Sequence, residues 1–372
     1  MLMNQSPKTK KLGAIHAQLR QEILSGVWEI GGKLPNEIEI AQRFECSPGT
    51  ISKALALLVH EGLVERKARA GTHVLRNTIE ERPPQTANKL DSFAFIYPSE
   101  QHEGIWRTVK GFQAAARDAD RRIVMLSTGT DYRKEAEYIG RLSEFDVRGA
   151  VIYPVISNPQ ELVQLSQMLV SSKFPVVLAE VHLPGLGCPS VIIDGFHAGH
   201  TMANHMIQRG AQRIGYFSNY AWAPFMRDRY NGYRWALREA GIEEPADGVF
   251  LESSMNPNFS DPLAEPTQMA EIFLRGASKL EAVVCADDYL AMGCVLAAEK
   301  LGIRIPDDML VSGIDDYASF TTPSGLGLTS YQIPFEEMGS KTFEVLEARV
   351  DAGTNRYNEI QLRGSIVIRG TA

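Results

Sequence analysis

Apolar residues recur at helical spacing in the first sixty residues of the chain and are separated by turn-forming residues. Ile15, Leu19 and Ile23 mark one face of a first helix that we expect to run from Ile15 to about Ser25. Two shorter helical patterns follow, and each is preceded by a residue that can cap a helix. Two short extended segments then flank a glycine turn. The pattern therefore predicts three helices followed by a β-hairpin.

The two shorter helices carry capping signals. Asn36 can accept hydrogen bonds at the start of the second helix, and Glu39, three residues later, completes a variant of the capping box. Ser47 can cap the third helix, with Pro48 at its first position, where a missing N–H costs little. The helical pattern ends at Gly62. Helices in this order with a paired ribbon predict a winged helix-turn-helix, a fold that lays one helix in the DNA major groove.

Residues at the exposed start of the third helix reach base edges in this fold. Hydroxyl groups, a lysine and a glycine that allows close backbone approach stand there, and all of these suit bases or phosphates. Positive charge also flanks the glycine turn of the hairpin, where a solvated charge run is the alternative interpretation. The predicted DNA-contacting residues are Ser47, Gly49, Thr50, Lys53, Arg66, Lys67, Arg69 and Gly71.

Residues 12–75 resemble the GntR family of bacterial regulators. The segments that carry the resemblance are LPNE, IAQRF, CSPGTISKAL, LLVHEGLVER and AGTHV. Pro48 stands where that family commonly has an arginine that contacts DNA. The resemblance therefore implies an operator-binding protein in which Thr50, Lys53 and the hairpin carry more of the recognition.

Charge separates this N-terminal part from the rest of the chain. Residues 1–82 carry 12 lysines and arginines against 9 aspartates and glutamates, whereas the whole chain has 38 against 45. The positive balance is confined to the part with the DNA-reading pattern. Residues 77–91 are polar, contain two adjacent prolines and lack apolar periodicity, which is typical of a linker. We expect a DNA-binding domain over 1–76 and a second domain over 92–372.

Several classes of protein are disfavoured by what the sequence lacks. No run approaches the ~18 apolar residues of a membrane span, and the N-terminus has no apolar signal segment, so we expect a cytoplasmic protein without membrane contact. The four cysteines form no CxxC pair and are expected to be reduced thiols. No nucleophile elbow, HExxH or P-loop motif occurs, and His197 and His200 share a face of an ordinary amphipathic helix. We expect no enzyme, cofactor or metal site.

After residue 92, short and wholly apolar runs alternate with helical patterns. Such runs are typical of parallel strands that are covered on both faces. The runs are too many for one compact sheet, and a second set begins near Arg213. We therefore expect an α/β body of two doubly wound lobes, with a ligand cleft at the carboxyl ends of the strands. The predicted strands begin at Phe93, Ile123, Gly149, Pro175, Ser190, Arg213, Ala282 and Met309.

This body resembles the effector domain of LacI/GalR-type regulators, which is related to periplasmic sugar-binding proteins. Segments 191–218, 227–242, 283–317 and 328–339 carry the resemblance, which covers about residues 91–370. Its combination with a GntR-type head is similar to the arabinose-repressor branch of the GntR family. The resemblance implies a periplasmic-binding-protein-like fold of type I and dimerisation through the effector domain.

The resemblance also places three charged residues in the cleft: Arg229, Asp287 and Asp315. Asp287 replaces the usual asparagine, which favours donor-rich ligands such as sugars and polyols over anions. Helix capping is the alternative role for both aspartates. Aromatic residues near strand ends are candidate apolar walls, although each could equally lie in the core. These aromatic candidates are Tyr97, Trp106, Tyr153 and Trp222, and the weaker polar candidates are Ser99, Glu100, Glu180, Asn219 and Gln332.

Together these patterns predict a ligand-responsive, DNA-binding transcriptional regulator, a repressor of carbohydrate-utilisation genes. We expect a homodimer with two heads that read a palindromic operator, and a small sugar effector bound between the lobes. A transport binding protein is excluded by the winged helix. The alternative is a constitutive dimeric regulator whose body has no small-molecule effector.

Overall fold

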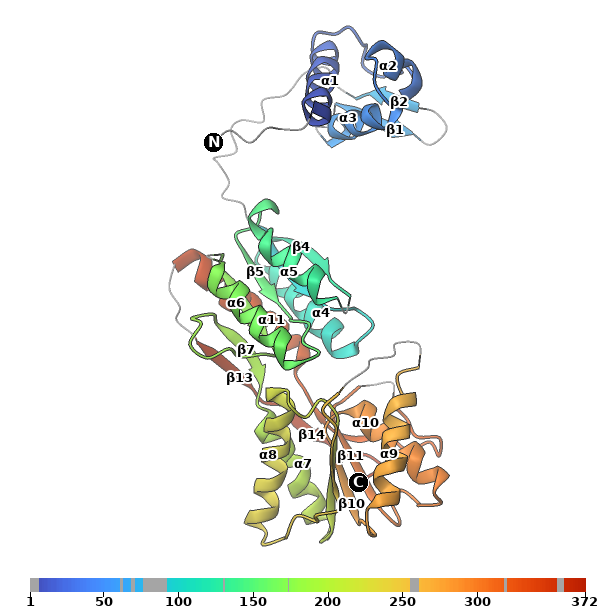
Figure 1. Ribbon diagram of the computed structural model, residues 1–372, viewed down its shortest axis with the longest axis vertical. Helices are drawn as coiled ribbons and strands as arrows, with labels where there is room; N and C mark the ends of the chain where they lie inside the picture. The colour runs from blue at the N-terminus through green and yellow to red at the C-terminus, as the bar shows by residue number, and fades with distance from the viewer. Residues whose placement is uncertain are drawn as a thin grey trace. The chain divides into compact units, whose positions relative to one another are not determined.

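The chain divides into two compact units, Met1–Asn88 and Lys89–Ala372, and each has its own buried core (Figure 1). The linker predicted over 77–91 spans the boundary between these units. The computed structural model describes residues 7–60, 63–67, 71–75, 92–129, 131–172, 174–254, 261–317, 320–352 and 358–372.

The smaller unit has the three helices and the hairpin that the apolar pattern predicts. One buried cluster, which includes Ile15, Leu19 and Leu55, holds the helices together. The first helix starts earlier than predicted, because the residues before Ile15 are helix-compatible but too polar to show apolar periodicity. The elements are α1 (Pro7–Leu24), α2 (Glu37–Arg43), α3 (Pro48–His60), β1 (Val64–Lys67) and β2 (Gly71–Val74).

The capping box predicted at the start of α2 is confirmed. Asn36 Oδ1 accepts hydrogen bonds from the backbone N–H groups of Ile38 and Glu39 at 3.0 and 2.9 Å. Glu39 Oε2 in turn accepts from the N–H of Asn36 at 2.8 Å. The third helix, α3, begins at Pro48 as predicted, and its predicted end at Gly62 lies outside the described residues. These signals fix where the two helices of the DNA-reading motif begin.

The hairpin forms a wing that is joined to the helical part of this unit. Strands β1 and β2 pair antiparallel in a register that sets Val64 opposite Val74. The segment before α2 pairs with β2, because the N–H of Leu34 donates to the carbonyl of Thr72 at 2.9 Å. Backbone hydrogen bonds therefore hold the wing from two sides.

The larger unit is built from two sheets, each with six strands in the described part of the chain. The sheet of the first lobe has the order β13-β7-β6-β5-β3-β4, and its neighbouring strands are all parallel. Helices α4 and α11 pack together on one face, and α5 and α6 cover the other. The elements of the first lobe are β3 (Ser92–Tyr97), α4 (Glu103–Asp118), β4 (Arg122–Ser127), α5 (Tyr132–Gly140), the 3-10 turn η1 (Leu142–Glu144), β5 (Gly149–Ile152), α6 (Pro159–Ser171), β6 (Val176–Ala179), β7 (Ser190–Ile193), α11 (Phe335–Ala352) and β13 (Glu359–Leu362).

The second lobe repeats this arrangement with the order β14-β12-β11-β10-β8-β9. Its strands are parallel except β14, which runs antiparallel to β12. Helices α7 and α8 pack together on one face, and α9 and α10 on the other. The elements of the second lobe are α7 (Gly195–Gln208), β8 (Ile214–Ser218), α8 (Pro224–Glu239), β9 (Val249–Leu251), α9 (Ala264–Gly276), β10 (Ala282–Cys285), α10 (Asp288–Lys300), β11 (Leu310–Asp315), β12 (Thr329–Gln332) and β14 (Ser365–Val367).

The central strands are apolar throughout because both faces of each sheet are covered. In β3, Phe93 and Phe95 belong to one buried cluster, whereas Ala94 and Ile96 belong to another. Every residue of this strand is buried. The prediction of doubly wound parallel sheets in two lobes is confirmed.

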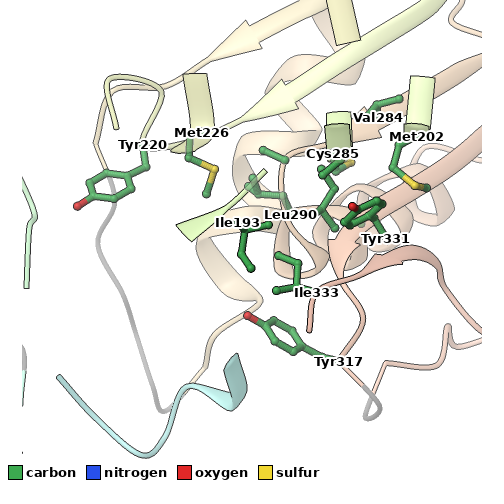
Figure 2. Close-up of a cluster of buried hydrophobic side chains, with 14 of the residues drawn as sticks. Ile193, Met202, Tyr220, Met226, Val284, Cys285, Leu290, Tyr317, Tyr331 and Ile333 are labelled. Atoms are coloured by element: carbon green, nitrogen blue, oxygen red, sulfur yellow. The ribbon is translucent and has the colours of Figure 1, made fainter. Parts of the chain in front are cut away.

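Three short segments cross between the lobes, after β7, after β12 and after β13. Ile193 and Ile333, from the first two crossings, lie in one buried cluster with Leu290 of the second lobe (Figure 2). In the third crossing, an added Cβ on Gly364 would lie 1.8 Å from the carbonyl oxygen of Gln332, so only glycine fits there. The crossings are therefore packed against each other rather than loosely connected.

The division into lobes does not follow the chain as simply as the sequence indicates. The second set of strands begins with β8 at Ile214, as predicted, but the second lobe itself begins earlier, with α7 at Gly195, and the chain later returns to the first lobe for α11 and β13. Four strands were not predicted, namely β9, β12, β13 and β14. Within the described residues, no helix has the length and apolar character needed to cross a membrane.

Candidate functional site

A cavity of about 280 Å³ lies between the two lobes of the larger unit. Most of its lining comes from the segments that follow β3, β5 and β6 of the first lobe and β8, β9, β10 and β11 of the second. These are carboxyl ends of parallel strands, where open α/β sheets bind ligands. The volume is near the lower limit of small-molecule sites, which are roughly 300–1,000 Å³. The cavity is therefore the candidate effector site, and it fits a small ligand.

Arg229 of α8 is the one guanidinium among the described residues that line this cavity. The side chain is 3 % exposed, and its terminal nitrogens donate to the carbonyl of Ala286 at 2.5 Å and to Asp315 Oδ1 at 3.2 Å. Its Nε is buried without a hydrogen-bond partner. A buried N–H group without a partner is costly, so Nε is a polar atom that the protein itself leaves unsatisfied.

The two aspartates predicted to line the cleft do line it, but they differ in their partners. Asp315 ends β11 and forms the buried ion pair with Arg229. Asp287 caps α10 and accepts from the N–H of Leu290 at 2.8 Å. Burial raises the pKa of both carboxyl groups, although the charge of Arg229 acts in the opposite direction. Capping and a place in the cleft are therefore compatible roles for Asp287.

Glu180 follows β6 and brings a carboxyl group to the cavity from the first lobe. The residue is 8 % exposed, and its Oε2 atom is buried without a hydrogen-bond partner. Burial raises the pKa of this carboxyl to about 7, and the charge of Arg229 offsets the effect only in part. Glu180 is thus a buried acid with one carboxyl oxygen, Oε2, that accepts no hydrogen bond from the protein.

Non-glycine residues with left-handed backbone conformation gather at the cavity. Glu180, Tyr220 and Asp315 have φ angles of 68°, 55° and 131° and all line it. Such conformations cost of order 1–3 kcal/mol each and persist where the surroundings enforce them, often at ligand sites. The backbone around the cavity is therefore held in place to orient these side chains.

Aromatic rings from both lobes meet at one end of the cavity. His102 caps α4 of the first lobe, and its ring lies 5.6 Å from Tyr317 and 6.1 Å from Tyr289 of the second lobe. Burial lowers the pKa of His102 to about 4, so the ring is neutral near pH 7. A neutral ring flanked by aromatic rings provides the apolar surface on which small ligands commonly pack.

The structure brings together only some of the residues predicted to bind the effector. Tyr153, Arg229, Asp287 and Asp315 line the cavity, as do the weaker candidates Ser99, Glu180 and Asn219. Tyr97, Trp106 and Trp222 lie outside its lining, and so do Glu100 and Gln332.

Three predicted aromatic residues lie elsewhere for identifiable reasons. The alternation along β3 turns Tyr97 to the same side as Phe95, with ring centroids 6.0 Å apart in the core. Trp106 packs at the edge of that core beneath Lys110, and Trp222 packs edge-on against Tyr220. Being near a strand end does not decide which way a side chain points.

Sequence reasoning missed several residues of the lining. Tyr289 and Tyr317 stand two residues after Asp287 and Asp315, so their position beyond strand ends was a usable signal. Tyr220 directly follows the weaker candidate Asn219. His102 and Phe225 had no comparable signal, because they are placed by the starts of α4 and α8 rather than by a strand.

A buried glutamate outside the cavity lining accepts a hydrogen bond from the backbone of a lining residue. Glu135 of α5 is 1 % exposed, and its Oε2 accepts from the N–H of Val155, which lines the cavity, at 2.8 Å. Burial raises the pKa of Glu135 to about 8. The folded unit therefore binds more protons here than the unfolded chain between about pH 4.5 and 8, and stability falls as the pH rises through that range.

We expect Glu135→Gln to remove this pH dependence while it keeps an oxygen that can accept from Val155. Between pH 5 and 8.5, the melting temperature of the variant should gain roughly 5 °C relative to wild type. Scanning calorimetry of the full chain measures this, with the exposed Glu137→Gln as the control. An offset that stays constant with pH would contradict the prediction.

In the smaller unit, the predicted DNA-contacting residues of α3 lie on its open surface. Ser47, Gly49 and Lys53 are exposed, Thr50 is partly buried, and the hydroxyls of Ser47 and Thr50 are 2.9 Å apart. A Cβ added to Gly49 would meet no atom within 4 Å, so packing within the unit does not require glycine there.

The structure describes fewer of the predicted contact residues in the wing than at the start of α3. Arg66 and Lys67 are in β1, Gly71 begins β2 with a φ of 98°, and Arg69 lies outside the described residues. The start of α3 is therefore the better defined part of this candidate nucleic-acid interface.

Comparisons with known proteins agree with both units. Residues 12–74 match the family described as bacterial regulatory proteins, gntR family, and residues 203–372 match the periplasmic binding protein-like domain. The arabinose metabolism transcriptional repressor of Geobacillus stearothermophilus is 27% identical over 96% of this chain and 97% of its own length. The HTH-type transcriptional regulator RegA of Clostridium saccharobutylicum is 30% identical over 69% of this chain and 74% of that protein.

Solved structures show the same fold. A transcriptional regulator CelR–cellobiose complex superposes with a TM-score of 0.66 at 20% identity, covering 88% of this chain and 91% of that one. The transcription regulator GntR from Chromobacterium violaceum gives a TM-score of 0.61 at 22% identity, covering 75% and 98%.

The fold and these likenesses define a DNA-binding transcriptional regulator rather than an enzyme. The chain is related to HTH-type transcriptional regulators, and it combines a gntR-family DNA-binding domain at residues 12–74 with a periplasmic binding protein-like domain at residues 203–372.

Proposed function

We propose that this chain is a dimeric, ligand-responsive repressor of carbohydrate-utilisation genes, with a small sugar or polyol as its effector. The observation that carries the proposal is the cavity between the lobes, where buried polar atoms of both lobes lack partners. Glu180 Oε2, Asn219 Oδ1 and Arg229 Nε are such atoms. Since buried polar groups are almost always hydrogen-bonded, a ligand rich in hydroxyl groups satisfies them.

A ligand held by both lobes would stabilise one relative position of the lobes. The dimer has one form that binds DNA and one that does not. The ligand can change the affinity for DNA only as far as it binds one of these forms more tightly than the other. The relatives support the carbohydrate part of the proposal, because the one from Geobacillus stearothermophilus is a repressor of arabinose metabolism and the CelR structure contains cellobiose.

The direct experiment is a thermal-shift screen of the full chain against pentoses, hexoses, disaccharides and polyols. Each compound that raises the melting temperature is then added to a complex of the protein with operator DNA, followed by fluorescence anisotropy. We expect at least one compound to stabilise the protein and to change its operator affinity. The alternative, a constitutive regulator, predicts no compound with both effects.

The DNA-reading surface gives a test that separates binding from folding. We expect Gly49→Ala to leave the smaller unit as stable as wild type, or more stable by up to about 1 kcal/mol, because alanine favours a helix. Operator affinity should fall at least about 10-fold, since the added methyl group lies where the backbone must approach DNA closely.

The operator for this measurement is selected from random DNA by the full-length protein, and affinity is read by anisotropy. Ala17→Ser adds one atom to the exposed face of α1 and is the control, with unchanged affinity expected. Wild-type affinity in Gly49→Ala would remove the start of α3 from the DNA interface.

A further inference from the structure

The cavity between the lobes is strongly unbalanced in charge. The described residues that line it include one guanidinium and five carboxyl groups. The acidic lining residues are Glu180 and Asp315, which are buried, Asp287 and Glu265, which are part-buried, and Asp261, which is exposed. Buried charges of one sign need a counter-charge or a proton, because the transfer of an isolated ion out of water is very costly.

The protein itself supplies counter-charge for only part of this set. Asp315 is paired with Arg229 across 3.2 Å. Asp287 caps α10, where backbone N–H groups and the helix dipole favour a negative charge. Glu180 accepts no hydrogen bond at its buried Oε2, and Arg229 acts on it only as a nearby charge. Glu180 is therefore the buried carboxyl group of the lining that the protein compensates least.

The backbone at Glu180 shows that this position is enforced. Its φ of 68° is a left-handed conformation that glycine adopts without cost, yet a long acidic side chain occupies it. Its N–H donates to the carbonyl of Val191 on the neighbouring strand β7 at 2.9 Å, which anchors the main chain. The strained residue thus holds a buried carboxyl group in the lining of the cavity.

From this geometry we infer that the effector is a polyhydroxylated amine, an amino sugar or amino polyol, whose ammonium group binds Glu180. The inference rests on the proposed function, because it takes the cavity to be the effector site. A hydroxyl group could donate one hydrogen bond to Glu180 but would leave its charge uncompensated, whereas an ammonium ion supplies both hydrogen bonds and charge.

Protonation gives this inference a signature that neutral ligands lack. Burial raises the pKa of Glu180 to about 7, so near neutral pH the carboxyl is partly protonated when no cation lies beside it. An ammonium ion beside it favours the charged form and lowers this pKa, so binding releases a proton. Affinity for an amine that stays protonated in this range, such as 1-amino-1-deoxysorbitol, should therefore rise between pH 6 and 8, whereas the less basic 2-amino-2-deoxy sugars lose their own proton toward pH 8.

The test is calorimetry of the full-length protein with matched sets of probes. Each set contains a neutral sugar, its 2-amino-2-deoxy analogue and the N-acetyl derivative: glucose, galactose and mannose with their amines, and sorbitol with 1-amino-1-deoxysorbitol. In at least one set, the amine should bind at least 10-fold tighter than the neutral members. With 1-amino-1-deoxysorbitol, which is fully protonated at pH 7, titrations in phosphate and in HEPES should show proton release; Tris is avoided because it is itself a polyhydroxylated amine.

Two variants test whether Glu180 causes the preference for the amine. Glu180→Gln keeps the size and one acceptor oxygen, and it should weaken binding of the amine about 10- to 100-fold while the neutral analogue changes less than about 3-fold. Glu243→Gln removes an exposed charge outside the cavity lining and should change neither. Equal losses for amine and neutral analogue in Glu180→Gln would overturn the charge role.

The remaining outcomes separate the two proposals. If a neutral sugar binds tightest in every set, or if no amine binds, the effector is not an amine; a neutral sugar that changes operator affinity would still support the proposed function. If an amine binds as described but leaves operator affinity unchanged, the ligand class stands and the regulatory role fails.

Discussion

Replacement of Arg229 by alanine is expected to abolish effector binding and to destabilise the larger unit by roughly 3–5 kcal/mol. Arg229 is the buried cation of the cavity, and it holds Asp315 and the carbonyl of Ala286 at the ends of two neighbouring strands. Without it, the carboxylate of Asp315 stays buried with no counter-charge and must take up a proton. Both consequences follow from one side chain because the same contacts stabilise the fold and shape the site.

Calorimetric melting of the full chain measures the first effect, and titration with an effector found in the screen measures the second. Arg227→Ala removes an exposed arginine from the same helix and is the matched control, with wild-type behaviour expected. A variant Arg229→Ala that melts like wild type and still binds the effector would disprove the assignment of the cavity.

The isolated smaller unit, residues 1–88, is expected to bind the operator at least about 100-fold more weakly than the full-length protein. It has its own buried core, so it should fold by itself. In a dimer, binding of the first head raises the effective concentration of the second at its half-site, which strengthens overall binding by roughly 10²- to 10⁴-fold.

Anisotropy titrations at one fixed salt concentration compare the two proteins, since affinity for DNA depends steeply on salt. A fusion of residues 1–88 to an unrelated dimeric coiled coil should recover part of the lost affinity. Equal affinity of the isolated unit and the full chain would show that the larger unit does not pair the heads.

The elements that the sequence predicts best are those whose signals are local. The capping box of Asn36 and Glu39 and the proline at the start of α3 involve neighbours within three residues, and the structure shows both. The central strands were also predicted, because a strand that is buried on both faces appears in the sequence as an unbroken run of apolar residues.

The strands that the sequence does not predict lie at or next to the edges of the sheets. Strands β9, β13 and β14 are partly exposed, so they lack the apolar runs of the central strands. Which lobe each belongs to is decided by pairing over long sequence distances, such as that of Glu359 with Ser190. A local pattern contains no information about such pairing.

The same limit applies to the candidate site. Strand ends identified Arg229, Asp287 and Asp315 as candidates, because the fold brings those ends together. The direction of a side chain at the end of a strand depends on the local alternation and on the backbone conformation, which place Tyr97 in the core and Glu180 in the cavity lining. The partnerless state of Glu180 depends on every neighbour around it and therefore needed the structure.

The crossing of the chain between lobes has a consequence for synthesis on the ribosome. The edge strand β13 that covers β7, and β14 that covers β12, both lie within the last fourteen residues, Glu359–Ala372. The smaller unit is continuous in sequence and can fold as soon as it has emerged. Both sheets of the larger unit, in contrast, present an uncovered strand edge to other nascent chains until residues 359–367 have been synthesised.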